Sequence, residues 1–349
     1  MYIPVMKNHT VEVSVLQQLG YQNVFVDQIV PLVELIQEKT RSNSKLTFIQ
    51  ELARLLDSCQ DMSVMVDFYK STKLRNTTDA IREYVTMSVR YPEHCLSSLN
   101  ELAAYGNRVI PVISYLTEDI SIKRIKYEAE SLRAAFSRLA FRVKIQEFER
   151  VFPEIVILTK PNDYLILDIE SASHMNPVFK KVYKRIADSK KQYRFLSIIV
   201  NSHRPESLAN KDMVDAEPIA QIDNSLKELY ATTYMNRFDG FGDYACISSA
   251  LPSTGGTISP VGIYYSRENN YFVAYRGRAP QLSEFPEFIA PRISQSEYWR
   301  EFSDAHHHNC PGCREIRGIV DGVKSGRNQA QWKMITMLHY IYSISEEMG

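Results

Sequence analysis

The sequence predicts an α/β fold, a closed (β/α)₈ TIM-like barrel that carries a C-terminal β-hairpin and a helical extension. Two observations predict it. Short apolar runs rich in β-branched residues recur along the first 250 residues, and stretches with apolar residues at helical spacing lie between them. The runs lack strict alternation, which is typical of strands buried on both faces of a parallel sheet. Eight such runs indicate a barrel, and a doubly wound open sheet is the alternative if the strand count is wrong by one or two.

The predicted elements alternate along the barrel segment. The strands cover residues 2–6, 29–35, 63–68, 109–114, 140–145, 164–169, 195–200 and 244–247. Helices are predicted over residues 12–19, 46–56, 78–89, 122–139 and 178–187, where apolar residues recur every three or four positions.

The pattern changes after residue 250. Residues 252–256 are rich in turn formers, and two apolar runs at 261–265 and 271–275 flank a polar stretch, which predicts a β-hairpin. Helices are expected from residue 294 onward, ending with one over residues 329–345. We therefore divide the chain into a barrel, residues 1–250, and an extension, residues 251–349, that packs on the barrel.

The composition narrows the class of protein. Lys+Arg 41 balance Asp+Glu 41, so the basic excess that is typical of nucleic-acid binding is missing. No apolar run approaches the ~20 residues that a membrane span needs, and the first residues do not form a signal segment. Five cysteines, three of them isolated, do not indicate the disulfide framework of a secreted protein. We expect a cytoplasmic protein without a membrane partner.

Polar residues close or follow the predicted strands, where the loops of such barrels build active sites. The carboxylates are candidates for catalysis or for binding Mg²⁺, because converging negative charges need a cation, a lysine or a shared proton. The basic residues are candidates for gripping an anionic ligand. The plainer interpretation is that each acidic residue starts a turn or caps a helix, or that ion pairs simply close the barrel mouth. The carboxylates are Glu34, Asp67, Asp168 and Asp243, and the basic residues are Lys7, Lys144 and Arg276.

Residues 306–313, His-His-His-Asn-Cys-Pro-Gly-Cys, hold the densest group of soft metal ligands. The Cys-x-x-Cys spacing lets both sulfurs reach one ion at ~2.3 Å. We predict a closed structural Zn²⁺ site in a loop, because four strong ligands leave no position for water. A redox dithiol is an alternative, although no strand is predicted before Cys310. A second alternative is that the three histidines are exposed surface residues that bind no metal. The predicted ligands are His306, His308, Cys310 and Cys313, with His339 as a further candidate.

Several short blocks resemble the beta family proteins of bacteria and phages. They are residues 2–7, 29–34, 241–245 (Phe-Gly-Asp-Tyr-Ala), 259–265, 275–277 and 326–328, followed by Trp332 and His339. Their order and spacing carry the resemblance over nearly the whole chain. It implies a parallel α/β barrel, no established reaction and a suspected role in phage defence or exclusion.

The same resemblance bears on site residues. The family pattern falls on Lys7, Glu34, Asp243, Arg276, Trp332 and His339. The family usually has two histidines after the tryptophan, whereas the second is Tyr340 here, which weakens any proposal of a His-His pair that binds metal or moves protons.

Two functions remain open. The first is a metal-dependent phosphoester hydrolase or nucleotide-processing enzyme, in which the four carboxylates hold Mg²⁺ and the basic residues, with His339, bind a phosphate-containing ligand. The second is a non-catalytic sensor or assembly protein of a defence module, which recognises a protein partner.

Overall fold

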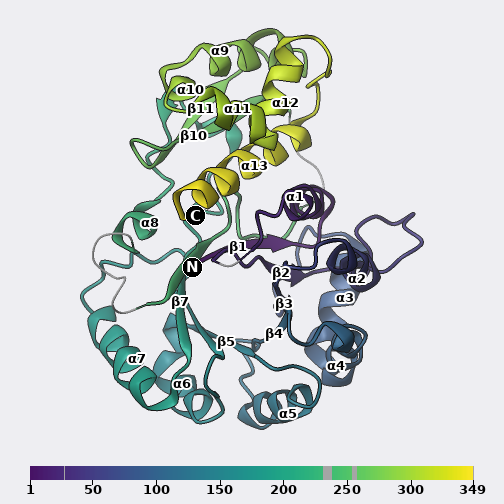
Figure 1. Cartoon of the computed structure of the whole chain (residues 1–349), viewed down its shortest axis with the longest axis vertical. Coiled ribbons are helices and arrows are strands. Elements are labelled where there is room, and N and C mark those ends of the chain that lie inside the picture. Colours follow the sequence, from purple (N-terminus) through teal and green to yellow (C-terminus); the bar gives the residue numbers. More distant parts are fainter. Residues whose placement is uncertain (27, 231–237, 254–257, 349) are drawn as a thin grey trace.

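The structure, a computed structural model, describes residues 1–26, 28–230, 238–253 and 258–348. Eight parallel strands close into a barrel, in the order β1-β2-β3-β4-β5-β6-β7-β9 (Figure 1). This confirms the (β/α)₈ prediction and excludes the open sheet. The barrel strands are β1 (Tyr2–Lys7), β2 (Leu32–Leu35), β3 (Val64–Phe68), β4 (Val109–Ile113), β5 (Ala140–Lys144), β6 (Tyr164–Asp168), β7 (Leu196–Val200) and β9 (Gly240–Asp243).

The eighth strand was predicted in the wrong place. The structure has it at Gly240–Asp243 rather than at residues 244–247. Ala245 and Cys246 have φ values of 47° and 66°, so the chain turns in the left-handed region directly after the strand. The true strand contains two glycines, which hide it from a search for apolar runs. Close packing requires one of them, because a Cβ at Gly242 would lie 2.5 Å from the carbonyl oxygen of Ile3.

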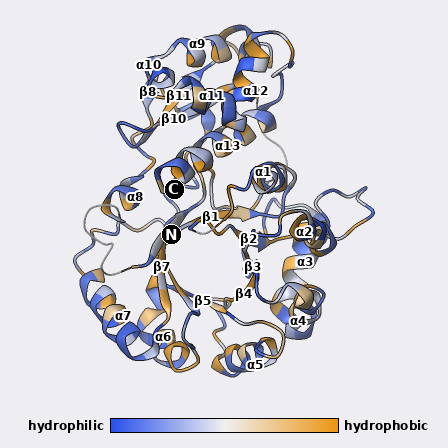
Figure 2. Cartoon of the chain, in the orientation of Figure 1, coloured by the Kyte–Doolittle hydropathy of each residue, from blue (hydrophilic) through white to orange (hydrophobic). Residues whose placement is uncertain are grey.

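Helices cover the outside of the barrel, and Figure 2 shows the strands mainly in hydrophobic colours while the outer turns of α7 are hydrophilic. The second helix shows why they form: Thr47 and Gln50 make a capping box, and the helix buries Leu52, Leu55 and Leu56 on one face. The helices are α1 (Thr10–Tyr21), α2 (Phe48–Ser58), α3 (Asp79–Arg90), α4 (Pro92–Asn100), α5 (Ile122–Leu132), α6 (Phe148–Val156), α7 (Phe179–Tyr193) and α8 (Ser225–Leu229), with short 3₁₀ turns at Ala103–Tyr105, Ile145–Glu147 and Asn210–Asp212. The expected helix over 122–139 ends earlier than predicted, and α4 and α6 were not predicted.

The C-terminal lobe is built on the predicted hairpin. Strands β10 (Val261–Ser266) and β11 (Tyr271–Arg276) pair antiparallel, and β8 (Glu217–Pro218) joins β11 from the barrel segment. Of the predicted turn at 252–256, residues 254–256 lie outside the described residues. The helices of the lobe are a π-helical turn at Phe285–Ile289, α9 (Ala290–Gln295), α10 (Glu297–Arg300), α11 (Asp304–Asn309), α12 (Pro311–Val320) and α13 (Gln329–Met348).

Helix α13 belongs to both parts of the molecule. Its Trp332 and Ile335 lie in the hydrophobic cluster of the lobe, whereas Leu338 and Ile341 lie in the barrel cluster. It runs beside α1, between the lobe and the barrel strands, where the eighth helix of a (β/α)₈ barrel is expected (Figure 1). The boundary at residue 250 therefore separates two regions that share β8 and α13. Within the described ranges, no helix is both long and apolar enough to cross a membrane.

Candidate functional site

The strand register brings the predicted residues together at the carboxyl end of the barrel. Lys7 is paired with Glu34, and Glu34 with Asp67, while Lys144 is paired with Asp168 on the opposite side. Paired residues of neighbouring strands share one face of the sheet. Their side chains therefore point toward the barrel interior at one mouth, as the sequence predicted.

Arg142, in the middle of β5, is the centre of this mouth. Its Nη1 donates to Glu34 Oε1 at 2.7 Å and to Asp67 Oδ2 at 3.0 Å. Its Nε donates to Asp168 Oδ2 at 2.9 Å, and its Nη2 donates to the Tyr244 hydroxyl at 2.9 Å. All five side chains are buried. One guanidinium thus compensates three carboxylates, in the forked geometry that arginine provides.

Lys7 and Glu34 are the incompletely satisfied members of the group. The Lys7 ammonium lies 3.6 Å from Glu34 Oε2 and 4.8 Å from the ring centre of Tyr244. Neither Lys7 Nζ nor Glu34 Oε2 has a hydrogen-bond partner. Burial lowers the pKa of Lys7, and Glu34 only partly offsets this. For Glu34, burial would raise the pKa, but Lys7 and Arg142 outweigh it and lower the pKa.

The charges of the mouth nearly cancel. With every group ionised, the two cations Lys7 and Arg142 face three carboxylates, a net charge of 2 − 3 = −1. Burial raises the pKa of Asp67 despite Arg142, so this carboxyl binds a proton more readily than a free aspartic acid does. In the described part of the chain, the mouth carboxylates do not form a group spaced to hold a metal ion. The Arg142 guanidinium lies between three of the four carboxylates that the sequence analysis proposed as Mg²⁺ ligands.

Two predicted residues do not join the mouth. Asp243 precedes Tyr244, whose hydroxyl lies inside the barrel, so Asp243 faces outward. There its carboxylate accepts from Tyr2 at 2.9 Å and from Tyr340 of α13 at 2.8 Å, as a clamp between barrel and helix. Arg276 ends β11 in the lobe with its side chain exposed, and its backbone N–H donates to Asp215. The prediction that both residues lie at the mouth was wrong. Asp243 is on the outer face of the barrel, and Arg276 is on a different sheet.

Lys144 lies at the rim of the mouth. It pairs with Glu170 at 3.1 Å, and its side chain is 32% exposed. An exposed pair of this kind contributes little free energy. Lys144 therefore resembles a surface residue next to the site more than a member of it.

The sequence did not single out Arg142 and Tyr244. Arg142 sits inside the apolar run 140–145, where a charged residue in the centre of a buried strand is itself a signal, because it must find a partner. Tyr244 was assigned to a strand that begins four residues too late. Its inward direction follows only once β9 is placed at Gly240–Asp243.

The histidines and cysteines gather in the lobe. The ligand atoms of His306, Cys310, Cys313 and His339 all lie within 4.8 Å of one another, and all four residues are buried. His308 is exposed and does not belong to the group, and His339 lies here rather than at the mouth. The expected loop is wrong as well: His306 is in α11, and Cys310 directly precedes α12. The group therefore joins three helices, α11, α12 and α13.

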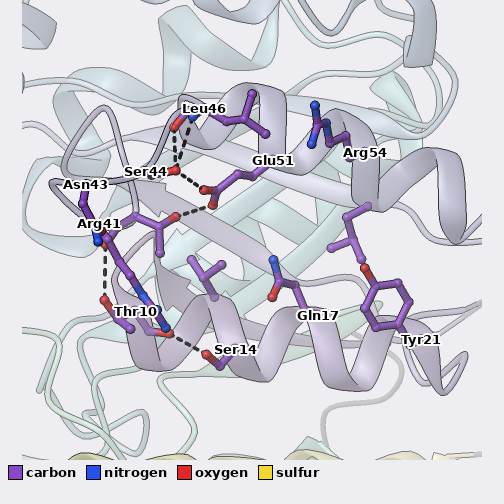
Figure 3. A pocket seen from close by; sticks show the side chains of 13 residues that line it. Thr10, Ser14, Gln17, Tyr21, Arg41, Asn43, Ser44, Leu46, Glu51 and Arg54 are labelled. Atoms are coloured by element: carbon purple, nitrogen blue, oxygen red, sulfur yellow. Dashed lines mark hydrogen bonds between the residues drawn. The ribbon is translucent and has the colours of Figure 1, made fainter.

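A hollow of about 450 Å³ opens between α1, α2 and the loop that precedes α2 (Figure 3). The Glu51 carboxylate on its wall accepts from the Thr40 hydroxyl at 2.6 Å and from the Ser44 hydroxyl at 2.8 Å. These bonds hold the loop against α2. None of the predicted site residues lines the hollow.

Comparison with known proteins identifies one family and several solved structures of low sequence identity. The sequence profile described as Beta protein matches residues 2–346. No curated protein matches the chain. Among solved structures, two mutant tryptophan synthase alpha-subunits from the hyperthermophile Pyrococcus furiosus show 11% and 12% identity and TM-scores of 0.41 and 0.42, each covering 69% of this chain and 86% of that one. A β-glucuronidase from Ruminococcus gnavus shows 9% identity and a TM-score of 0.39, covering 73% of this chain and 44% of that one.

Proposed function

Since this chain belongs to the beta protein family, we propose that it is a component of an anti-phage defence or phage-exclusion system whose barrel mouth binds a phosphate-containing ligand. The defence role is supported by the family resemblance. The ligand site is supported by one observation: the Lys7 ammonium and the neighbouring Glu34 Oε2 form an ion pair at 3.6 Å, and neither atom has a hydrogen-bond partner.

The two open atoms call for a ligand that both accepts and donates a hydrogen bond. A buried ammonium without hydrogen-bond partners is costly, typically by a few kcal/mol. A phosphate group that carries one proton satisfies both atoms, because an ionised oxygen accepts from Lys7 and the P–OH group donates to Glu34. The second pKa of such a group is about 6, so this form is accessible near neutral pH.

Binding is better supported than hydrolysis. A magnesium-dependent reaction needs oxygen ligands free to surround the ion at about 2.0–2.1 Å. Glu34, Asp67 and Asp168 are already engaged by Arg142, and Asp243 faces away from them. The mouth carboxylates are therefore better arranged to bind Arg142 than to surround Mg²⁺.

The burial of the same residues favours a second candidate, a non-catalytic sensor or assembly protein that recognises a protein partner elsewhere on its surface. Lys7 and Glu34 are each only 1% exposed, which restricts the access of a ligand to them. In this second function the ion pairs of the mouth serve only to close the barrel.

Thermal unfolding with inorganic phosphate and AMP as probes separates these functions. A ligand at 100 times its Kd stabilises the folded state by about 2.7 kcal/mol. We expect the melting temperature to rise for wild type and for Lys144→Met, the matched control at the rim, and not for Lys7→Met. In cells, Lys7→Met should also lose protection against phage. If neither probe shifts wild type and Lys7→Met still protects, the mouth is not the site and the second function is favoured.

A further inference from the structure

We propose that the C-terminal lobe binds one Zn²⁺ through His306 Nε2, His339 Nδ1 and the thiolates of Cys310 and Cys313. This site is separate from the barrel mouth and is independent of the function proposed for it. Its ion would be structural, because four protein ligands complete a tetrahedron and leave no position for water or substrate.

The spacing of the ligand atoms fits a tetrahedral ion. His339 Nδ1 lies 3.8 Å from Cys310 Sγ and 3.6 Å from Cys313 Sγ. A zinc ion with bonds of about 2.3 Å to sulfur and 2.0–2.1 Å to nitrogen places these atoms roughly 3.6 Å apart. The four ligand atoms lie within 4.8 Å of one another, so the site needs only a small contraction around the ion.

Both histidines are oriented for metal binding by their second nitrogen. Glu346 Oε2 lies 2.8 Å from His306 Nδ1, while His306 Nε2 is buried without a hydrogen-bond partner. The carbonyl oxygen of Tyr265 lies 3.2 Å from His339 Nε2. That carbonyl can only accept, so it fixes the proton on Nε2 and leaves the Nδ1 lone pair toward the sulfurs. Carboxylate and carbonyl partners of this kind orient histidine ligands in metal sites.

The backbone also brings the cysteines to α13. A Cβ on Gly312 would lie 2.7 Å from the Ile335 carbonyl oxygen and 2.8 Å from the His339 nitrogen, both backbone atoms of α13. Glycine between the two cysteines therefore permits the approach that places both sulfurs beside His339. The Tyr264 ring stacks on His339 with centroids 4.0 Å apart and covers the site.

A redox dithiol fits these observations less well. Both cysteines are reduced and 0% exposed, so a partner disulfide has no path to them. Sulfur and imidazole ligands exclude Mg²⁺ and favour zinc. A zinc ion here would join α11 and α12 to α13, the helix that also completes the barrel wall.

Metal analysis of the purified full chain tests this proposal. We expect about one Zn²⁺ per chain in wild type and in His308→Ala, the matched control for the exposed neighbouring histidine, because His308 does not belong to the four-ligand group. Cys313→Ser and His339→Ala should lose most of the metal.

Because those variants risk misfolding, cobalt substitution of the wild type provides the second measurement. Co²⁺ added to the chelator-treated chain should give the visible and sulfur charge-transfer bands of a tetrahedral S₂N₂ site, and Zn²⁺ should displace it. Wild type with neither zinc nor a cobalt spectrum would overturn the proposal, as would a Cys310–Cys313 disulfide in the freshly purified protein.

Discussion

At the scale of single residues, Arg142 determines the character of the barrel mouth. Burying Arg142 without a partner would cost several kcal/mol, and so would burying each of the surrounding carboxylates without one. The network lowers this cost because Glu34, Asp67 and Asp168 each receive a charge-assisted hydrogen bond from one guanidinium. The four charged side chains therefore depend on one another, and removal of the Arg142 guanidinium would affect all three carboxylates.

Arg142→Met should destabilise the protein by about 3–5 kcal/mol, because it leaves three buried carboxylates without compensation. Urea unfolding at neutral pH measures this free energy. Lys144→Met is the control, and its half-exposed pair with Glu170 predicts a loss of about 0–1 kcal/mol. Equal losses in the two variants would show that the mouth is open to water and that Arg142 is not its centre.

Asp67→Asn should change how stability depends on pH. Burial raises the folded pKa of Asp67 above the unfolded value of about 3.9. The folded state thus binds the proton more tightly, and the contribution of Asp67 is complete below pH ~4 and is lost as pH rises through the folded pKa. Asparagine cannot ionise, so the free energy of unfolding of the variant relative to wild type should rise from pH 4 to pH 8. Parallel pH curves from urea unfolding would contradict the raised pKa.

At the scale of elements, the contact of β9 with α13 depends on one carboxylate. Asp243 accepts from two buried hydroxyls, Tyr2 and Tyr340. Asp243→Ala leaves both without that partner, which should cost about 2–6 kcal/mol at 1–3 kcal/mol for each group.

A double-mutant cycle of Asp243→Ala with Tyr340→Phe should give a coupling free energy of about 0.5–3 kcal/mol, measured by chemical unfolding. Limited proteolysis of the Asp243→Ala variant should also cleave α13 faster than in wild type, because the clamp holds this helix against the barrel. Additive free energies would show that the two side chains do not interact in solution.

The contact of α12 with α13 depends on a glycine. Gly312→Ala places a methyl group against backbone atoms of α13, which cannot move independently, so we expect a loss of about 1–3 kcal/mol. Gly318→Ala, in the same helix, is the control because its methyl group meets only the flexible Lys324 side chain, at 3.2 Å. That change should be neutral or stabilise by up to about 1 kcal/mol through helix propensity. Thermal unfolding distinguishes the two, and equal effects would refute the close approach.

At the scale of the whole molecule, the barrel is incomplete without the C-terminal part of the chain. Met337, Leu338, Tyr340 and Ile341 of α13 lie in the barrel cluster, and Lys333 pairs with the buried Glu12 of α1 at 3.0 Å. The eighth helix position is thus filled only after the chain has built the lobe.

A fragment of residues 1–250 should therefore fail to fold cooperatively, because it exposes the apolar surface and buried polar groups that α13 covers. Circular dichroism during urea titration would show a broad, non-cooperative change. Co-expression of residues 251–349 as a separate chain should restore a cooperative transition. A fragment that unfolds with full-chain cooperativity would show that the boundary at residue 250 divides independent domains.

Local patterns predicted most of the fold. Seven barrel strands and the hairpin were recognised within a few residues, since runs of β-branched residues such as Ile198 and Ile199 reflect burial on both faces. Strand β9 was not recognised, because its close packing requires glycines, and glycines have no apolar side chain to produce a hydrophobic run. For the site, Lys7, Glu34, Asp67 and Asp168 were predicted, since strand ends of a parallel barrel meet at one mouth.

The sequence by itself determined the barrel, its hairpin and which ligand types lie near one another, because periodicity and Cys-x-x-Cys spacing act over a few residues. Only the tertiary structure decided the partners. It directed Asp243 outward to Tyr340, placed Arg142 among the mouth carboxylates, and brought His339 rather than His308 beside the cysteines. These choices depend on strand register and helix packing between segments far apart in the chain, which no local pattern encodes.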